Sequence, residues 1–525
     1  MSTEPRPEAA PWWATAVFYQ IYPRSFADGN GDGTGDLIGV RDRLDHLVDL
    51  GVDALWISPF YRSPMADGGY DVADPCDVDP IFGTLADFDA LLEAAHARGV
   101  RITIDMVPNH FSDEHPWFRA VLAGDTALRD RFVIRPGTGP DGAEPPNNWP
   151  SQFGGPAWTR LPDGEWYLHL FAPEQPDLNW DNPAVPAEFE RIMRFWLDKG
   201  VDGFRIDVAH SMAKPAGLPD LAAETLQHAL AGGNMPGSDD IRWDRDGVHE
   251  IHRLFRRVLD DYDGERMAVG EAWVADPQRL ALYVRPDELN LTFNFELVVA
   301  GWGASTFRTA IDSSLAALSE VGAPCTWVLS NHDVDRVATR YGGGDLGVAR
   351  ARAAALVQLS LPGAVYLYNG DELGLQNVDL PDDALQDPTW ERSGHTERGR
   401  DGERVPLPWS GDEPPYGFTT GTPWLPMPDD WAAVTVAAEG AHATSTLHLF
   451  QAATACRRST MAGLPVGAVD WLDAPADCLS YRRGDVTVLL NAGTDPVPVP
   501  DGEVLVASGP VVDGMLPPDT AVWIR

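Results

Sequence analysis

Lys199-Gly-Val-Asp-Gly-Phe-Arg-Ile-Asp-Val-Ala-His210 is the stretch that decides the fold. Apolar residues precede it at spacings of three and four, which predicts an amphipathic helix ending near Gly200: Phe189, Ile192, Met193 and Trp196. The apolar run 201–206 is too short for a helix and predicts a buried parallel strand. Arg205 and Asp207 lie two residues apart, so their side chains leave one face of the strand, and we expect Arg205 to keep Asp207 ionised. The alternative is a purely structural ion pair at the strand end.

The same unit of helix, glycine, apolar strand and polar loop recurs along the chain. Candidate strands lie within residues 16–26, 52–59, 100–107, 201–206, 266–270, 289–293, 326–330 and 364–368. Helices that alternate with buried strands indicate a parallel sheet. Eight such units predict an α/β fold, a (β/α)8 TIM barrel, with its chemistry at the C-terminal ends of the strands.

Three long segments do not fit a simple barrel. About a hundred residues separate the third strand from the fourth, more than a crossover helix needs, which predicts an inserted subdomain at 111–176. Residues 211–246 form a second excursion that would border the pocket. After a last barrel helix at about 444–458, short Val-rich runs predict a C-terminal all-β domain, a sandwich, at 463–525. The barrel would then comprise residues 1–110 and 177–462.

The amino-acid composition limits the classes of partner that this protein is expected to bind. Asp plus Glu outnumber Lys plus Arg by 79 to 39, a formal charge of −40, which disfavours nucleic acid and anionic membranes and suits a small neutral substrate. The four cysteines are scattered without CxxC spacing, which argues against a disulfide framework or a zinc site. We expect a cytoplasmic protein, because no signal-like or membrane-spanning apolar segment is present. The oligomeric state stays open between monomer and homodimer.

The loop after the first strand alternates glycine with oxygen-bearing residues. It reads Asp28-Gly-Asn30-Gly-Asp32-Gly-Thr34-Gly-Asp36. This is the ligand rhythm of an EF-hand-like loop, without the flanking helices or the Glu at the twelfth position. We expect a structural Ca²⁺ site, with Mg²⁺ as an alternative, formed by the side chains of Asp28, Asn30, Asp32 and Asp36 and the carbonyl of Thr34. A solvated Gly/Asp turn is the plain alternative.

Acidic or histidine residues follow nearly every predicted strand. They are Asp67 and Asp71 after the second, Asp105 and His110 after the third, Asp207 after the fourth, Glu271 after the fifth, and His332 and Asp333 after the seventh. Only the catalytic face of such a barrel has reason to collect carboxylates in this way.

These motifs resemble the α-amylase superfamily of glycoside hydrolases, and within it the oligo-1,6-glucosidase and α-glucosidase branch. The resemblance covers nearly the whole chain and includes segments 20–26, 28–36, 105–110, 175–179, 203–207, 270–271, 331–333 and 400–404. It implies that Asp207 is the nucleophile, Glu271 the general acid/base and Asp333 the carboxylate that stabilises the transition state. Retaining cleavage needs two carboxyl groups about 5–5.5 Å apart.

The resemblance also implies the residues that bind the sugar. Tyr70, His110, Arg205 and His332 match contacts to the first glucose, and Phe153 and Phe171 would form an aromatic wall from the inserted subdomain. Asp67 and Arg400 match a pair that grips the non-reducing end of the terminal glucose, and we expect each to be the other's charge partner. Val208, after the nucleophile, leaves α-1,4 and α-1,6 preference open.

The expected function is therefore that of a retaining, exo-acting α-glucosidase acting on short oligosaccharides or α-glucosides. A transglucosylase or trehalose-synthase-like isomerase of the same superfamily would share every catalytic residue. A non-catalytic sugar-binding or transporter-associated barrel is a second alternative, which the intact carboxylates disfavour. A metal-dependent barrel hydrolase is a third, but Tyr22-Pro23 ends the first strand where a His-x-His pair would be needed.

Overall fold

The computed structural model describes residues 10–231 and 239–525; residues 1–9, and the part of the predicted excursion at 232–238, lie outside the described residues. Eight parallel strands form one sheet in the order β11-β10-β9-β5-β2-β1-β13-β12. Their bounds are Val17–Ile21 (β1), Ala54–Ile57 (β2), Arg101–Met106 (β5), Gly203–Ile206 (β9), Met267–Gly270 (β10), Leu291–Thr292 (β11), Thr326–Val328 (β12) and Ala364–Tyr368 (β13). Every predicted strand is confirmed.

The sheet closes into a nearly complete barrel at β11 and β12. There the hydroxyl of Thr326 donates to the carbonyl of Thr292 and accepts from the backbone N–H of Asn294 at 3.1 Å. A side chain thus takes the place of backbone pairing at the seam.

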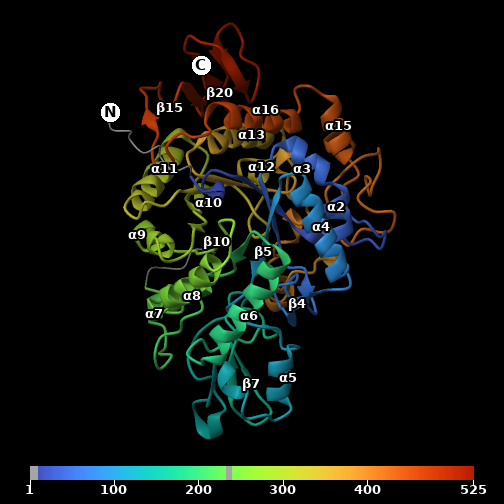
Figure 1. The fold of residues 1–525 in the computed structure, drawn as a ribbon, viewed down its shortest axis with the longest axis vertical. Helices are drawn as coiled ribbons and strands as arrows, with labels where there is room; N and C mark the ends of the chain where they lie inside the picture. The colour runs from blue at the N-terminus through green and yellow to red at the C-terminus, as the bar shows by residue number, and fades with distance from the viewer. Residues whose placement is uncertain (1–9, 232–238) are drawn as a thin grey trace.

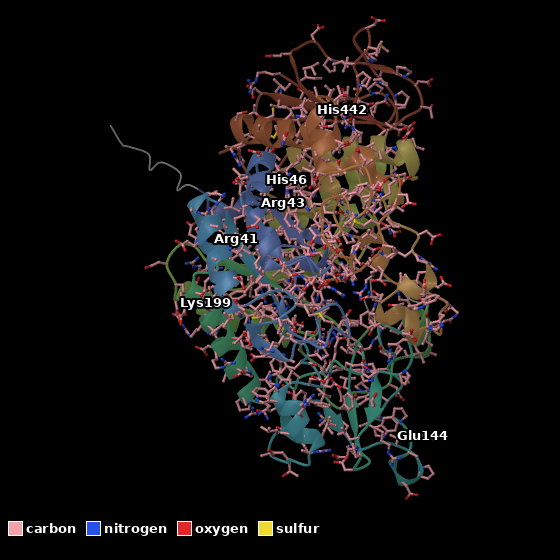
Figure 2. The ribbon with its side chains drawn as sticks, turned by 90° about the vertical axis from the view of Figure 1, so that its right-hand side faces the viewer. Arg41, Arg43, His46, Glu144, Lys199 and His442 are labelled. Carbon is pink, nitrogen blue, oxygen red and sulfur yellow. The ribbon has the colours of Figure 1, made fainter. Side chains whose placement is uncertain are left out.

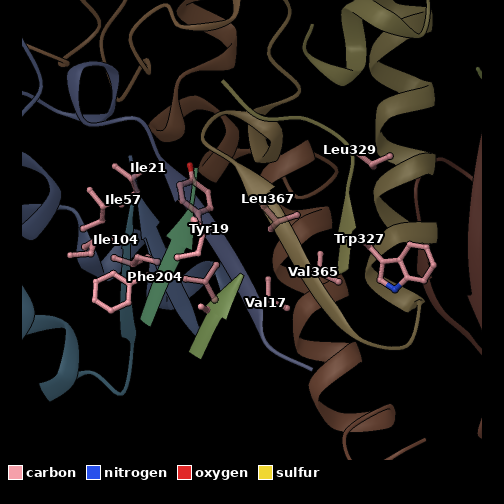
Figure 3. Packing of buried hydrophobic residues seen from close by; sticks show 14 of the residues in the cluster. Val17, Tyr19, Ile21, Ile57, Ile104, Phe204, Trp327, Leu329, Val365 and Leu367 are labelled. Atoms are coloured by element: carbon pink, nitrogen blue, oxygen red, sulfur yellow. The ribbon is translucent and has the colours of Figure 1, made fainter. Parts of the chain in front are cut away.

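Alternation along the strands separates two apolar layers. On β1, Val17, Tyr19 and Ile21 face outward to the helices, together with residues such as Ile57, Ile104 and Leu367 (Figure 3). Phe18 belongs to a second cluster that fills the barrel, with Ala54, Trp56, Met267, Val269, Leu291, Phe293, Val328, Ala364 and Tyr366. The inward side chains of β5 and β9 include Asp105 and Arg205 instead, which marks the polar end of the interior.

Helices surround the strands (Figure 1). They are α1 Pro23–Phe26, α2 Leu37–Asp42, α3 Leu44–Leu50, α4 Leu85–Ala97, α6 Ala184–Lys199, α8 Val248–Asp260, α9 Pro277–Ala281, α10 Glu296–Val299, α11 Ala304–Ser319, α12 Val337–Arg340, α13 Gly344–Ser360, α14 Pro388–Arg392, α15 Val436–Ala441 and α16 Thr446–Thr460. As predicted, α6 ends at Gly200, whose φ of 105° is readily adopted only by glycine. Single-turn 3-10 helices lie at Trp12–Ala14, Arg129–Arg131, Pro140–Gly142, Leu282–Val284, Asp371–Leu373, Asp382–Ala384, Asp401–Glu403 and Trp431–Val434.

The insertion after β5 is a small subdomain at one end of the molecule, where Figure 2 labels Glu144. It holds α5 (Pro116–Leu122) and a three-stranded sheet of β6 (Ile134–Arg135), β8 (Trp166–Leu168) and β7 (Trp158–Arg160). The subdomain has its own apolar cluster. Helix α7 (Ala223–Leu230), which belongs to the excursion after β9, packs against this cluster. A hairpin of β3 (Tyr61–Arg62) and β4 (Asp74–Val78) carries the loop that contains Asp67.

The C-terminal segment is all β and lies at the opposite end (Figure 1). Strands β14 (Asp470–Trp471), β15 (Cys478–Arg483), β16 (Val486–Asn491), β20 (Thr520–Ile524) and β18 (Val504–Ala507) form one sheet; β17 (Val497–Pro498) and β19 (Met515–Leu516) form a second. Val497 and Leu516 pack on Leu489, Val522 and Ile524 of the larger sheet, so the two sheets face one another. Within residues 10–231 and 239–525, no helix has the length and apolarity that crossing a bilayer requires.

Candidate active site

A cavity of about 850 Å³ opens at the C-terminal ends of the strands. Nine of the residues predicted from the sequence line it: Asp67, Tyr70, His110, Phe153, Phe171, Asp207, Glu271, Asp333 and Arg400. The other two, Arg205 and His332, are fully buried beside it: Arg205 donates to Asp207, and Nε2 of His332 lies 3.3 Å from Oδ2 of Asp333. The structure therefore brings the whole predicted constellation into one pocket.

Arg205 is the central cation of this pocket. Its Nη1 donates to Oδ1 of Asp207 at 2.6 Å and to Asp105 at 2.5 Å, while its Nη2 donates to Oε2 of Glu271 at 2.6 Å. One planar guanidinium thus donates to both Asp207 and Glu271, which holds these two carboxyl groups close together.

The pKa of Asp207 is set by burial and by several charged neighbours. Burial raises its pKa well above the usual range and Arg205 opposes this, but Glu271, Asp105 and Asp333 add to the increase. Burial likewise raises the pKa of Asp105 to about 6 despite Arg205. Arg205 acts on Asp207 in the predicted direction, but a single arginine is divided among the three carboxylates Asp105, Asp207 and Glu271.

Glu271 is held by N–H groups on both oxygens. Trp273 Nε1 donates to Oε1 at 2.8 Å, and the backbone N–H of Val208 donates to Oε2 at 3.0 Å. Trp273 is itself fixed by stacking on Phe295, with ring centroids 3.9 Å apart. Val208 has φ of 35°, a strained value for a β-branched residue, directly after Asp207. The contact from Trp273 was not predicted from the sequence. The only signal for it there is the position of Trp273 two residues after Glu271.

Arg400 closes one end of the cavity. Its Nη2 donates to Asp67 at 2.7 Å, its Nη1 to Asp333 at 2.8 Å and its Nε to Asp387 at 2.6 Å. Asp67 and Arg400 do pair, but the expectation that each is the other's charge partner was wrong for Arg400, which has three carboxylate partners. Loss of Asp67 would therefore not leave this arginine without a counter-charge.

We call the charged group at this end of the cavity the clamp; it comprises Asp67, Asp333, Asp387, Arg400 and Arg404. Asp387 and Arg404 were not predicted as site residues. Burial would raise the pKa of Asp387, but Arg400 and Arg404 outweigh it and lower the pKa to about 2. Arg404 also donates to Asp333 at 3.0 Å. Burial likewise opposes ionisation of Asp333, yet His332, Arg400 and Arg404 hold its pKa well below its ordinary value. These cations therefore favour the ionised form of Asp333.

Neighbouring side chains fix the remaining sugar-site candidates. Tyr70 stacks on His332 with centroids 5.3 Å apart, and the amide of Gln20 lies 2.7 Å from Nδ1 of His332. Gln175, within one of the quoted motifs, bonds Asp67 at 3.1 Å and His110 at 3.0 Å. The aromatic wall comes from the inserted subdomain, where Phe171 packs on both Phe153 and His110, with ring centroids 5.9 and 5.3 Å away.

The glycine-rich loop 28–36 lies away from the pocket lining. Asp28 accepts from the backbone N–H groups of Gly31 and Gly33 and from the hydroxyl of Thr419, so the loop is fastened to the segment around residue 419. Asp36 is fully buried; its Oδ1 accepts from Gly29 and Gly39, and its Oδ2 has no protein partner among the described residues. A buried carboxylate oxygen without a donor fits a loop that binds a cation.

Among residues 10–231 and 239–525, one group of three His, Cys, Asp or Glu side chains has its ligand atoms within 4.8 Å of one another: His249, His252 and Glu288. Asp28, Asp32 and Asp36 do not converge in this way. Glu288 already accepts from Arg253 at 2.9 Å and from Arg285, and from His249 at 2.8 Å. Two arginines next to the carboxylate oppose a further divalent charge, so we assign this cluster to the packing of α8.

Glu403 lines the cavity, and its ionisation makes the free energy of unfolding depend on pH. Burial, opposed by Arg404, raises its pKa to about 8. Because the folded pKa exceeds the unfolded value of about 4.3, its favourable contribution is complete below about pH 4.3 and is lost as pH rises through about 8.

We therefore expect Glu403→Gln to stabilise the fold relative to the unmodified protein as pH rises. The difference in unfolding free energy should grow by up to about 1.4 kcal/mol per pH unit between about pH 5 and pH 8. Urea unfolding at both pH values measures it, with the exposed Glu413→Gln as control. A difference that is equal at both pH values would contradict the assignment.

A family model described as the alpha amylase catalytic domain matches residues 20–463. Oligo-1,6-glucosidase of Parageobacillus thermoglucosidasius is 38% identical over 477 residues, which is 84% of this chain and 82% of the relative. Trehalose-6-phosphate hydrolase of Escherichia coli (strain K12) is 37% identical over 483 residues, with coverages of 85% and 84%. The crystal structure of XgtA, an alpha-glucosyl transfer enzyme, matches with a TM-score of 0.88 and 36% identity over 98% of this chain and 100% of that one.

Proposed function

The chain belongs to the α-amylase family, and from that premise we propose that it is a retaining, exo-acting α-glucosidase. It removes terminal glucose from short α-linked oligosaccharides or α-glucosides. The observation that carries the proposal is the clamp of Arg400, which joins Asp67 to Asp333 at 2.7 and 2.8 Å. The closed end of the cavity therefore lies one guanidinium away from Asp333, and we infer that it accommodates a single sugar ring.

The contacts assign one step to each carboxyl group. Asp207 attacks the anomeric carbon; among the described residues no partner is bound to its Oδ2, since Arg205 engages Oδ1. Glu271 protonates the leaving oxygen, and then takes the proton from the water that hydrolyses the glucosyl ester of Asp207. Asp333, held charged by Arg400 and Arg404, stabilises the positive charge that develops on the sugar ring.

The polar groups at the closed end match the hydroxyls of one glucose. Asp67 offers an acceptor and Arg400 a donor to the 4-hydroxyl, so a chain extended from that hydroxyl would collide with both. His110 and Tyr70 bind the remainder of the ring, and Phe153 and Phe171 cover it from the subdomain. His332 supports Tyr70 by stacking on its ring.

Initial rates on maltose, isomaltose, sucrose, trehalose and soluble starch, with products identified, test this function. We expect glucose from one or more of the disaccharides and negligible action on starch. Transfer products or an isomerised disaccharide without free glucose would instead favour a transglucosylase, as the similarity to XgtA suggests.

Trehalose 6-phosphate should bind worse than trehalose, because Arg400 is committed to carboxylates and Arg242 to Asp240.

We also propose that loop 28–36 binds a structural divalent cation, Ca²⁺ or Mg²⁺, through Asp28, Asn30, Asp32, Asp36 and the carbonyl of Thr34. The unpartnered Oδ2 of Asp36 supports this. The cation would fasten the loop after β1 to the segment that carries Thr419.

Chelation, or Asp32→Ala, should lower the melting temperature by several degrees, because a cation bound only to the folded state stabilises it by mass action. Calorimetry with and without added Ca²⁺ or Mg²⁺ measures this, and the exposed Asp49→Ala on α3 is the control. An unchanged melting temperature in both experiments would contradict the proposed cation site.

A further inference from the structure

Asp71 is a buried carboxylate that the proposed mechanism does not use. It follows Tyr70 in the loop between β3 and β4, has no exposed surface and does not line the cavity. Burial raises its pKa to about 6, although the N–H groups of Asp67 and Ala66 and the side chain of Ser63 oppose the increase. The described part of the chain gives it no cationic partner. Because burying a carboxylate without a cation costs free energy, its presence here calls for a reason beyond packing.

The carboxylate of Asp71 holds the backbone next to Asp67. Its Oδ2 accepts from the N–H of Ala66 at 2.9 Å, and its Oδ1 accepts from the N–H of Asp67 at 3.0 Å. Two consecutive N–H groups are thus turned toward one side chain, which fixes the peptide planes on both sides of Ala66. The side chain of Asp67 leaves the chain at the end of the second plane, so its direction follows from the orientation of that plane.

The backbone on either side of Asp67 has unusual conformations. Met65 has φ of 66°, in the left-handed region that a residue with a side chain seldom adopts, and Gly68 and Gly69 have φ of 57° and 107°. Such conformations persist where surrounding contacts impose them. The hydrogen bonds to Asp71 are contacts of this kind, because they tie the end of the loop back to its middle.

The direction of Asp67 matters because both of its oxygens have partners. Oδ1 accepts from Arg400 at 2.7 Å, and Oδ2 accepts from Gln175 at 3.1 Å. In the proposed function the same carboxylate also accepts from the 4-hydroxyl of the terminal glucose. A charged hydrogen bond depends on direction as well as distance, so a rotated backbone would weaken this contact. Asp71 therefore lies directly behind the group that binds the glucose.

We propose that Asp71 is the positioning residue of the closed end of the cavity: its carboxylate sets the backbone at residues 66–67 and thereby aims Asp67 at the terminal glucose. The inference rests on the proposed α-glucosidase function and deepens it by a residue that acts through Asp67. Asp71 makes no contact with the substrate, so its effect on the reaction should disappear when the side chain of Asp67 is removed.

A double-mutant cycle of Asp71→Asn and Asp67→Ala tests this dependence. Asparagine has the size of aspartate, but its amide N–H group replaces one acceptor oxygen and faces a backbone donor. For the disaccharide that the unmodified enzyme hydrolyses fastest, we expect Asp71→Asn to lower kcat/KM about five- to twenty-fold, and less than about two-fold when Asp67 is already alanine. The inhibition constant of glucose should follow the same pattern. Titration of active sites with a mechanism-based fluoroglucoside corrects each rate for the active fraction.

Asp74→Asn is the matched control, because Asp74 is an exposed carboxylate of the same hairpin that accepts from the backbone N–H of Cys76 at 2.9 Å. It should change kcat/KM little in either background. Asp71→Ser, whose hydroxyl can accept from a backbone N–H, takes the place of Asp71→Asn if the asparagine variant does not fold.

The outcomes separate the inference from the function. Equal losses in both backgrounds, or no loss in either, would overturn the positioning role of Asp71. Failure of both the asparagine and the serine variant to fold would overturn it too, because Asp71 would then be a requirement of the fold. Absence of glucose release from every disaccharide by the unmodified enzyme would refute the proposed function, and this inference with it.

Discussion

Asp207→Ala abolishes glucose release, with kcat/KM reduced by about 10⁴-fold or more, while the melting temperature changes little. The reason is that Asp207 supplies the attacking oxygen, and the remaining residues can bind the sugar but cannot form the covalent intermediate. Arg205 keeps Asp105 and Glu271 as partners at 2.5 and 2.6 Å, so the buried cation is not stranded.

Kinetics and labelling measure this together. A 2-deoxy-2-fluoro-α-glucosyl fluoride or a related mechanism-based reagent should label the peptide that contains Asp207. Circular dichroism and thermal melting of the variant serve as the folding control. Labelling at Glu271 or Asp333 would reverse the assignment of roles.

Asp67→Ala has the second largest effect, an expected loss of about 1.5–3 kcal/mol in transition-state binding, or about ten- to hundred-fold in kcat/KM for disaccharides. It removes one charged hydrogen-bond acceptor for the terminal glucose. The loss is limited because Arg400 retains Asp333 and Asp387 at 2.8 and 2.6 Å.

Steady-state kinetics on a disaccharide substrate, with the exposed Asp49→Ala as control, measure this effect. Asp67→Ala should also weaken competitive inhibition by glucose, since the contact is to the ring and not to the leaving group. Unchanged kcat/KM, or rapid fragmentation of starch by the unmodified enzyme, would contradict the closed pocket.

The barrel could be predicted because its signals are local. Each strand is a short apolar run bounded by glycine or a polar turn, and the residue types at the strand ends follow from the topology. Asp207 and Arg205 were found in this way, two residues apart on one strand. The C-terminal domain followed from the loss of helical periodicity after residue 462.

The clamp at the closed end could be predicted only in part. Asp67 and Arg400 are 333 residues apart, and their pairing rested on a resemblance rather than on a pattern in the chain. Asp387 and Arg404 lie in a polar stretch where charged side chains are ordinarily solvated, so nothing local distinguishes them. Their importance comes from the contacts of Asp387 with Arg400 and of Arg404 with Asp333, which only the folded structure defines.

The sharing of Arg205 among three carboxylates could not be predicted either. Two residues on one strand suggested a simple ion pair, but the inward side chains of β5 and the end of β10 add Asp105 and Glu271 to the same guanidinium. A pKa depends on all charges within a few ångströms, and those come from three different strands.

The most direct test of the account is proton NMR of maltotriose during its first minutes of hydrolysis. A retaining enzyme with a pocket closed by Asp67 and Arg400 releases glucose as the α-anomer, together with maltose, before mutarotation sets in. Initial release of β-glucose, or cleavage that produces transfer products with no free glucose, would contradict the account.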